Sequence, residues 1–529
     1  MFVSTKQYCR PWNKYPAQSR YNFIYSESLL SLPSNASQAP TASYFPIIDL
    51  SLSHYYLRYS CVNNKQKKVM LIYRMPINPY FKTLLRSAVL GIILSIIISM
   101  EITSVSSDPS PSPAVIYKEL KDRLSPDSEV LLATNTNLTD AGFTVRWNAF
   151  DAPSYVVYAK PANNHDVKTI VQYASKANVP FLATGGGSGY TNTTAALKGA
   201  IGVDLGNFKS ISIDANGNRM TVGGGVIFDD IFDPLHAVGK EIQNNELFWG
   251  IRGAGQNFGI VTSATYRVHD QTNNGTALNG DFVYPASAKE SIFQLIKSIE
   301  NDQPDELSIF PSIMFDMPTQ ATAIMVSLIY IGPEEKGMSY MQPFIDSSPI
   351  RQSVGLLPWN KLIKENRFGV DAMACAKGGD HAVFGLNVNE FDVATYVGLV
   401  DDFDAFYAQN PANILSILVL ELFPNRVARS VPDEETAYPY RDSTGHMLLS
   451  FTFQDEAASV VAKQFALKTR SKLLEKGCRK SPLEVYVNYA HGDEGPVAWY
   501  SERKLPRLRA LKSRWDPKNL FKWTNGVLQ

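Results

Sequence analysis

The chain has 529 residues, 45% of them hydrophobic and 11% aromatic, so it can fill the cores of two or three domains and is not a disordered protein. Its 50 basic and 50 acidic side chains cancel to a formal net charge of zero, which removes long-range attraction to nucleic acid or to an anionic membrane surface and favours a small-molecule partner. The four cysteines form no CxxC pair and the seven histidines are scattered, which argues against zinc, iron–sulfur and dithiol redox sites. A disulfide between Cys375 and Cys478 is permitted in a secreted protein, although the sequence does not place it.

The first feature along the chain is an apolar run, residues 88–100, preceded by a lysine and an arginine. This order is typical of a signal peptide, and the run is shorter than the roughly twenty residues that a bilayer span needs. A start at Met75 would give the signal peptide its normal position, so residues 1–74 are interpreted as a gene-model extension and residues 75–106 as the signal peptide. The alternative is a transmembrane signal anchor with a cytoplasmic tail, which would hold the protein in the endomembrane system.

A Ser/Pro-rich segment, residues 107–113, follows and is interpreted as a linker into the mature protein. Three sequons, at Asn137, Asn192 and Asn274, provide glycan acceptors if the chain enters the secretory pathway. These features together predict a secreted, extracellular glycoprotein.

The first folded part, residues 114–275, has an α/β pattern. Residues 153–161 read as a β-strand, and residues 164–178 place apolar side chains at helical spacing behind an asparagine. A buried strand over residues 179–184 leads into a glycine run, and further short β-type runs and a helix at 229–238 follow.

A second region, residues 276–480, mixes strands such as 323–330 with helices such as 458–476. We assign it as a separate substrate domain. The predicted fold class is therefore α+β in two parts, followed by a C-terminal segment over residues 481–529.

The glycine run GGGSG, residues 185–189, ends the buried strand. Glycines at a strand end allow positive φ values and let backbone N–H groups approach a charged ligand, as a diphosphate site requires. The alternative is a tight turn that needs glycine only for its dihedral angles. A nucleophile elbow is excluded because GxSxG would need glycine where Tyr190 stands, and a secreted α/β hydrolase fails with it; no helix follows, as a Rossmann fingerprint demands.

A second glycine-rich segment spans residues 246–268 and interleaves four glycines with Trp249 and Phe258. This composition suits backbone that wraps around a flat aromatic ligand, although an ordinary glycine-rich bend is the alternative.

Taken in order, these segments resemble a known family. FLATGGGSGY with IGVDLGNFKSISID, ELFWGIRGAGQNFGIVTSATYRV, the YVNY element at 486–489 and LRALKSRWDPKNLFKWTN at 508–525 are similar to motifs of the berberine-bridge-enzyme-like branch of the vanillyl-alcohol-oxidase superfamily. PDEETAYPYRDSTGHM at 432–447 looks like the fungal members. The resemblance covers roughly residues 114–525.

The resemblance implies a PCMH-type FAD-binding domain, a substrate domain with an antiparallel sheet backed by helices, and a C-terminal segment that returns to the FAD domain. It implies an FAD-dependent oxidoreductase that takes hydride from a C–H of an alcohol, sugar or secondary metabolite to flavin N5, with dioxygen as the usual acceptor. The residues that it assigns to FAD are Thr184, Gly185, Gly186, Gly187, Ser188, Gly189, Tyr190, Gly253, Asn257, Gly259, Ile260, Val261 and Asn525.

For the base, the resemblance implies Tyr489 or Tyr486, with Asn488 positioning the tyrosine or the flavin. A phenol has a pKa of about 10, so the site would have to lower this pKa with hydrogen bonds or a cation, for which Arg441 is a candidate. The alternative is a half-buried strand edge with satisfied hydroxyls. His491 lies in a Gly/Asp loop that is expected to be exposed, and the PDEET run is expected to be a solvated loop rather than a metal site.

The sequence departs from the family's pattern at two places. Ser188 stands where the family commonly has a histidine tethered to the flavin, so FAD is expected to bind non-covalently. Gln243 joins directly to Asn244, where the family has several tens of further residues, including a second tether, a cysteine, and strands whose loss would leave backbone groups unpaired. Either the gene model is mis-spliced or the chain is a degenerate paralogue, and the alternative function is a non-catalytic, flavin-less secreted binding or structural protein.

Overall fold

The computed structural model describes residues 21–24, 110–134, 137–242, 249–300, 302–475 and 482–528. The predicted signal peptide and Cys478 lie outside these ranges, and Cys375 is a free, exposed thiol. Within the ranges that the structure describes, no helix is long and apolar enough to cross a membrane. We divide the folded chain into an N-terminal half (residues 21–24 and 110–275), a large-sheet region (276–475) and a C-terminal segment (482–528).

The N-terminal half begins with a small mixed sheet in the order β2-β3-β5-β4, in which β3 and β4 both run parallel to β5. Its helices are amphipathic, as predicted: the Asn163 side chain caps the first turn of α3, and Val167, Ile170 and Val171 pack against the sheet. The elements are α2 (Pro113–Arg123), β2 (Glu129–Leu132), β3 (Tyr155–Lys160), α3 (Asn164–Lys176), β4 (Phe181–Thr184), η2 (Asn192–Ala196) and β5 (Ala200–Asp204).

A second sheet of the N-terminal half has the order β1-β9-β7-β6, with β8 also paired to β9. Its apolar core lies under α4, from which Ile231, Phe232 and Leu235 contact strands β7 and β9. The elements are β1 (Tyr21–Ile24), β6 (Ile211–Ile213), β7 (Arg219–Gly223), α4 (Phe228–Ala237), β8 (Lys240–Ile242), α5 (Ile251–Ala254), η3 (Gly255–Asn257) and β9 (Ile260–Asp270).

We predicted that the gap after Gln243 would leave backbone groups of neighbouring strands unpaired, and β9 is the strand that follows this gap. β7 pairs with one side of β9, and β1, from the far N-terminus, pairs antiparallel with the other side at Ile260 to Ala264. Strand β9 is therefore paired on both sides at Ser263 and Ala264, while Ile260 and Val261 pair with β1.

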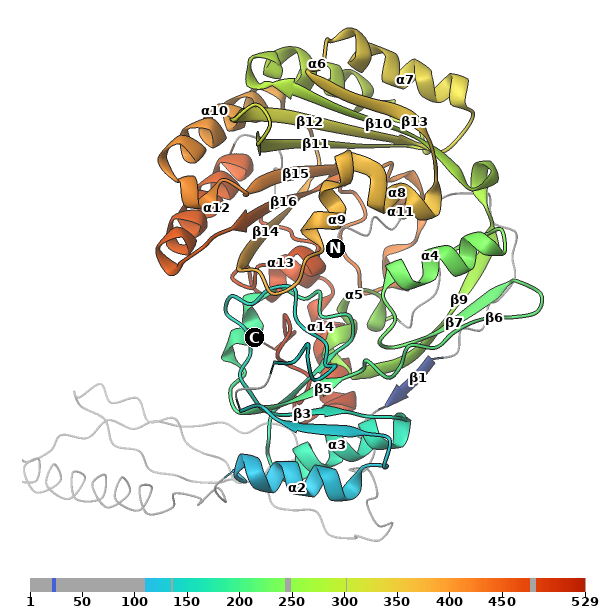
Figure 1. Ribbon diagram of the computed structural model, residues 1–529, viewed down its shortest axis with the longest axis vertical. Helices are drawn as coiled ribbons and strands as arrows, with labels where there is room; N and C mark the ends of the chain where they lie inside the picture. Colours follow the sequence, from blue (N-terminus) through green and yellow to red (C-terminus); the bar gives the residue numbers. More distant parts are fainter. Residues whose placement is uncertain are drawn as a thin grey trace, which may run out of the picture. The chain divides into compact units, whose positions relative to one another are not determined.

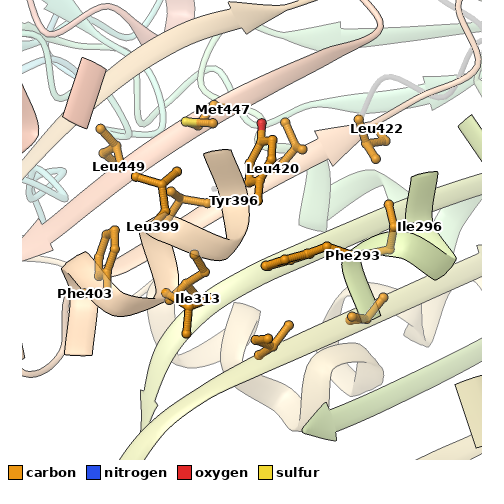
Figure 2. Close-up of a cluster of buried hydrophobic side chains, with 14 of the residues drawn as sticks. Phe293, Ile296, Ile313, Tyr396, Leu399, Phe403, Leu420, Leu422, Met447 and Leu449 are labelled. Atoms are coloured by element: carbon orange, nitrogen blue, oxygen red, sulfur yellow. The ribbon is translucent and has the colours of Figure 1, made fainter. Parts of the chain in front are cut away.

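The large-sheet region is one antiparallel sheet of seven strands in the order β13-β10-β12-β11-β15-β16-β14. Helices α6, α7, α10 and α12 cover one face (Figure 1), and Figure 2 shows side chains of α6 and α10 meeting those of β11, β15 and β16. This arrangement confirms the predicted α+β class with helices behind an antiparallel sheet. The strands are β10 (Thr276–Pro285), β11 (Leu307–Asp316), β12 (Ala321–Tyr330), β13 (Arg351–Pro358), β14 (His381–Val388), β15 (Ile417–Leu422) and β16 (Gly445–Thr452); the helices are α6 (Lys289–Glu300), α7 (Glu334–Asp346), α8 (Trp359–Glu365), η6 (Asn366–Gly369), α9 (Val370–Ala374), α10 (Val393–Gln409), α11 (Arg426–Ser430) and α12 (Glu456–Glu475).

The opposite face of this sheet is also largely buried, and it carries polar side chains among apolar ones such as Phe310, Met325 and Leu448. Side chains alternate between the two faces of a strand, so the neighbours of the core residues point away from the helices. On this second face β10, β11, β12, β14, β15 and β16 carry polar residues, among them Asn279, Asp281, Ser312, Ser327, Asn387, Glu421 and His446. Segments α8, η6 and η9 contact this face.

The C-terminal segment returns to the N-terminal half, as the resemblance implied. η9 (Val487–Tyr489) lies against β14, and α13 (Pro496–Tyr500) and α14 (Leu505–Trp515) share a core with Ala254 and Phe258. Beyond α14, the Phe521 ring lies 5.5 Å from that of Phe181 in the small mixed sheet.

Candidate functional site

The glycine loop after β4 exposes a row of unused backbone donors. No backbone N–H of residues 185–190 donates a hydrogen bond to another residue that the structure describes. Ser188 and Gly189 are exposed, so the row is open to solvent on one side. Consecutive free N–H groups in a loop form an anion-binding concavity.

Glycine is also required in this loop for packing. A Cβ at Gly186 would lie 2.3 Å from Ile227 Cγ2, and one at Gly187, which has a φ of +74°, would lie 2.5 Å from the Val145 carbonyl oxygen. The tight-turn interpretation is therefore supported by packing, and ligand binding by this loop stays a prediction. Two cations flank it: Arg146 Nη2 donates to the Gly189 carbonyl at 2.9 Å, and Lys377 Nζ donates to the Gly186 carbonyl at 2.8 Å.

The structure brings three of the predicted tyrosines together. The rings of Tyr486 and Tyr489 lie 5.0 Å apart, and both pack with Tyr190 beside Val383 and Leu448 of the large sheet. Asn488 is exposed and its Nδ2 donates to Tyr486 Oη at 2.6 Å. The Tyr190 hydroxyl is buried and has no hydrogen-bond partner in the described part of the chain. A buried hydroxyl without a partner is costly unless a ligand completes it.

A carboxylate that we did not predict completes this cluster. Glu421, on the polar face of β15, accepts a hydrogen bond from Tyr489 Oη at 3.0 Å and is only 2% exposed. Burial raises the pKa of Glu421 to about 7, partly offset by the bond from Tyr489. The sequence contains one indication of this residue: Glu421 is the single charged residue of the strand ILVLEL.

The pKa of Tyr489 moves in the opposite direction from our expectation. Burial raises it well above its usual value of 10, and the nearby Glu421 raises it further. Arg441, the candidate cation, instead donates to Thr436 Oγ1 and lies 5.9 Å from the Tyr438 ring. The prediction that a cation lowers the pKa of the tyrosine is therefore wrong, because the polar partner on this face is a carboxylate.

His446 is the cross-strand neighbour of Glu421. Burial lowers its pKa to about 4, so its imidazole is neutral at pH 7. His446 Nδ1 lies 3.0 Å from Asn387 Oδ1, which also accepts the backbone N–H of Tyr486 at 3.0 Å. These contacts hold Tyr486, the first residue of the YVNY element, against the large sheet.

His491 is not the exposed loop residue that we expected. It is 6% exposed, its ring stacks on Phe384 at 3.9 Å, and Asn192 Nδ2 lies 3.1 Å from its Nε2. Burial lowers the pKa of His491 to about 4. Its place is structural: it joins the segment after the glycine loop to the C-terminal segment.

The second glycine-rich segment packs tightly against the loop before β16. Gly253 has a φ of +134°, and a Cβ there would lie 2.3 Å from the backbone nitrogen of Tyr438. Of the other residues assigned to FAD, Gly259 precedes β9, and Ile260 and Val261 are its first two residues. Ile260 is buried in the core of the small mixed sheet.

The two predicted asparagines are engaged with the protein. Asn257 Nδ2 donates to Tyr500 Oη at 3.0 Å and its Oδ1 accepts the Val527 N–H. Asn525 Oδ1 accepts from Thr191 Oγ1 at 2.8 Å and its Nδ2 donates to the Val487 carbonyl. Both side chains therefore hold the tail in place.

The PDEET run is tied into the fold rather than free. Asp433 accepts hydrogen bonds from Arg503 and forms an ion pair with Lys504, and the Arg503 hydrogen bond is the main cause that lowers the pKa of Asp433 to about 2. Among the described residues, no group of three or more His, Cys, Asp or Glu side chains is placed to hold a metal ion.

Comparison with known proteins identifies two family segments. Residues 155–258 match the model of an FAD binding domain, and residues 485–528 match the model described as berberine and berberine like. The FAD-linked oxidoreductase azaL of Aspergillus niger is 33% identical over 470 residues, covering 78% of this chain and 98% of the relative. The FAD-linked oxidoreductase tazG of Aspergillus terreus is 32% identical and covers 76% of this chain and 93% of the relative.

Solved structures share the fold. A carbohydrate oxidase from Microdochium nivale superposes with a TM-score of 0.63 at 18% identity, over 79% of this chain and 99% of that one. A variant of BBE-like 1 of Physcomitrella patens superposes with a TM-score of 0.64 at 16% identity, over 79% of this chain and 99% of that one. The predicted PCMH-type fold class is thereby confirmed.

The alignment with azaL also bears on the gap. It extends over 470 residues but takes up only 78% of a 529-residue chain, so it places gaps in this sequence. This agrees with a segment that relatives have and this chain lacks.

Two observations on the structure fit FAD, the group that the FAD binding domain implies. The row of free N–H groups in residues 185–190, with Arg146 and Lys377 beside it, suits a diphosphate. The unpartnered hydroxyl of Tyr190 lies in the cluster with Tyr486 and Tyr489, where a ligand can complete it. Thr184 and the glycine loop would hold the diphosphate, and the tyrosine cluster would face the reacting end.

Proposed function

Because this chain belongs to the family of FAD-linked oxidoreductases, we propose that the hydrogen-bonded pair of Tyr489 and Glu421 is the base of its reaction. The protein is an FAD-dependent oxidoreductase that oxidises an alcohol, a sugar or a secondary metabolite. FAD, when bound, supplies the acceptor for the hydride. The chain itself has to hold the substrate and take the proton from its hydroxyl group.

The 3.0 Å hydrogen bond from Tyr489 Oη to Glu421 Oε2 carries the proposal. A phenol with a raised pKa is a poor base at neutral pH, whereas a carboxyl with a pKa of about 7 is well matched to it. As Tyr489 Oη takes the proton of the substrate hydroxyl, it passes its own proton to Glu421 Oε2. The phenol stays neutral, and the net base is the carboxylate.

The other members of the cluster position this pair. Asn488 donates to Tyr486 Oη, and the Tyr486 ring packs edge-on against Tyr489, so the exposed amide restrains both rings. Asn387 holds the Tyr486 backbone. We assign the large-sheet region as the substrate domain, because its polar face supplies Glu421 and Asn387 to this site.

The test is the rate of flavin reduction by substrate without oxygen, followed by the flavin's visible absorbance. Glu421→Gln and Tyr489→Phe should each lower this rate by roughly 10²–10⁴-fold while FAD binding is kept. In the unsubstituted protein the rate should rise with pH through about 7, the pKa of Glu421, and Glu421→Gln should remove this rise.

Tyr330→Phe is the matched control, since this buried tyrosine lies on the helix-covered face of the sheet. It should reduce the flavin at the normal rate. An unchanged pH profile in Glu421→Gln would refute the pair as the base. Colourless protein that does not take up added FAD would instead favour the flavin-less alternative.

We further propose dioxygen as the electron acceptor and non-covalent FAD. Several proteins of the same fold are named oxidases, which supports the first proposal. The side chain of Ser188 lacks the imidazole that forms the tether, which supports the second. Hydrogen peroxide formed in step with oxygen uptake tests the acceptor, and yellow colour left in the supernatant after acid precipitation tests the attachment.

Secretion remains our proposal for the location. Asn137 and Asn274 are exposed, as glycan acceptors must be, whereas the Asn192 side chain contacts His491 in the interior. We expect glycans at the first two sites only, and glycosidase treatment of the protein from culture medium, followed by peptide mass mapping, checks this.

A further inference from the structure

A loop of the large-sheet region lies directly on the N-terminal half beside the glycine loop. This loop, residues 374–380, is held by backbone contacts: Ala149 N–H donates to the Gly379 carbonyl at 2.9 Å, and Gly378 N–H donates to the Arg146 carbonyl at 3.0 Å. Trp147 Nε1 donates to the Ala374 carbonyl at 2.7 Å. These contacts fix where the side chains of the loop can reach.

Lys377 reaches the glycine loop from this position. Its Nζ donates to the Gly186 carbonyl at 2.8 Å, and Arg146 reaches the same loop from the other end at Gly189. The two cations therefore bracket the six backbone N–H groups of residues 185–190 that have no acceptor in the described chain.

The protein offsets the charge of these cations only in part, because burial and Lys209 each lower the pKa of Lys377 by more than the Asp204 carboxylate raises it. The nearby carboxylate of Asp204 already accepts from the Thr144 N–H and hydroxyl, and Lys209 is paired with Asp230. Lys377 and Arg146 have no ion-pair partner among the described residues, and the pKa of Lys377 is lowered by burial first and then by Lys209. A site with unpaired cations and free N–H groups favours an anion.

We propose that Lys377 binds the diphosphate of FAD, so that a cation from the large-sheet region completes a cofactor site formed by the N-terminal half. Its ammonium group has three N–H donors on a flexible side chain, so it can bind a phosphate oxygen as well as the Gly186 carbonyl. The cofactor then joins the two regions, because one anion is held by backbone of the first and by a side chain of the second.

The experiment compares two probes on the deflavinated protein: FAD, and riboflavin, which has the same ring but no phosphate. Binding is followed by flavin fluorescence. Lys377→Met should weaken FAD binding by roughly tenfold, as the loss of one charge-assisted hydrogen bond predicts, and leave riboflavin binding unchanged. Lys377→Arg should restore FAD binding, and the loss in Lys377→Met should shrink as salt is added.

Lys361→Met, an exposed lysine of α8, is the control and should bind both probes normally. Equal weakening of FAD and riboflavin by Lys377→Met would overturn the proposal, because the lysine would then act only by holding the loop. Unchanged FAD binding, or a wild-type chain that binds no FAD, would overturn it as well. The affinity for FAD is read without turnover, so failure of the Tyr489 and Glu421 mechanism leaves this result intact.

Discussion

The large-sheet region keeps its seven strands in one continuous sheet, whereas the N-terminal half divides its strands between a four-stranded and a five-stranded sheet. The large sheet buries one broad apolar cluster under four helices. The N-terminal half has two smaller clusters, one for each sheet. A single large sheet buries its apolar side chains in one core of its own. The stability of two small sheets depends in addition on the contacts between them.

The joint between the two small sheets includes backbone in direct contact. A Cβ added at Gly225, just after β7, would lie 2.2 Å from the carbonyl oxygen of Leu205, just after β5, and one at Gly185, just after β4, would lie 2.8 Å from that of Gly224. Side chains add to this joint, since Ile260 of β9 and Phe208 pack into the core of the small mixed sheet. The comparison teaches that the half that binds the cofactor relies on close backbone contact and on the returning C-terminal segment.

The largest expected effect comes from Lys512, which supports the N-terminal half from α14. It is fully buried, forms an ion pair with Asp516 at 2.7 Å, and donates to the carbonyls of Asn257 and Phe521. Lys512→Met leaves a buried carboxylate unpaired and should lower the free energy of unfolding by about 4 kcal/mol. Hydrogen exchange read by peptide mass should show the loss of protection in the N-terminal half first. Lys118→Met is the control, because it removes only the exposed ion pair of Lys118 with Asp122 and should leave stability unchanged. An equal loss of protection in the large sheet would contradict the idea that the two regions differ in what stabilises them.

A smaller effect is expected from the joint itself. Gly225→Ala forces a methyl group onto the Leu205 carbonyl and should cost about 3 kcal/mol, because neighbouring backbone has to move. Gly355→Ala is the matched change in β13 of the large sheet, where a Cβ meets nothing within 4 Å. Urea unfolding of both variants measures the difference, and equal midpoints would contradict the idea that glycine contact joins the small sheets.

The smallest expected effect is a change in the free energy of unfolding with pH, which Glu421 of the large sheet causes. The pKa of Glu421 is raised to about 7 from an ordinary value of 4.5, so the folded state holds this proton more tightly than the unfolded state. Its contribution to stability is complete below the ordinary pKa and is lost as pH rises through about 7. Between pH 5 and 8 the free energy of unfolding should fall by about 2 kcal/mol, and Glu421→Gln should remove this fall. A rise in stability over this range in the wild type would contradict the assignment.

Much of the fold could be predicted because its motifs are local. The glycine loop follows a buried strand, and the apolar positions of α3 follow helical spacing behind their asparagine, so both are properties of neighbouring residues. The tyrosine element was found by resemblance alone. Tyr190, Tyr486 and Tyr489 come together only because the C-terminal segment returns to the loop after β4.

The parts that could not be predicted depend on contacts between residues that are far apart in the sequence. Glu421 meets Tyr489 only through the register of β15 and the return of the C-terminal segment, so the carboxylate and the direction of the pKa shift were missed. His491 was expected to be exposed because its neighbours are Gly and Asp, yet Phe384 covers its ring. Burial of this kind is set by distant elements and leaves no trace in local composition.

The tail that closes the N-terminal half has a consequence for how the protein is made. Asn525 is bound to Thr191 and Val487, and Val527 N–H reaches Asn257, so residues 525–527 complete contacts with segments of the N-terminal half. The ribosome produces these residues after every strand of the large sheet. The large-sheet region can therefore pair all its strands first, whereas the half that receives FAD closes only once residue 527 has been made, and the order of synthesis sets the earliest moment at which the enzyme can be loaded.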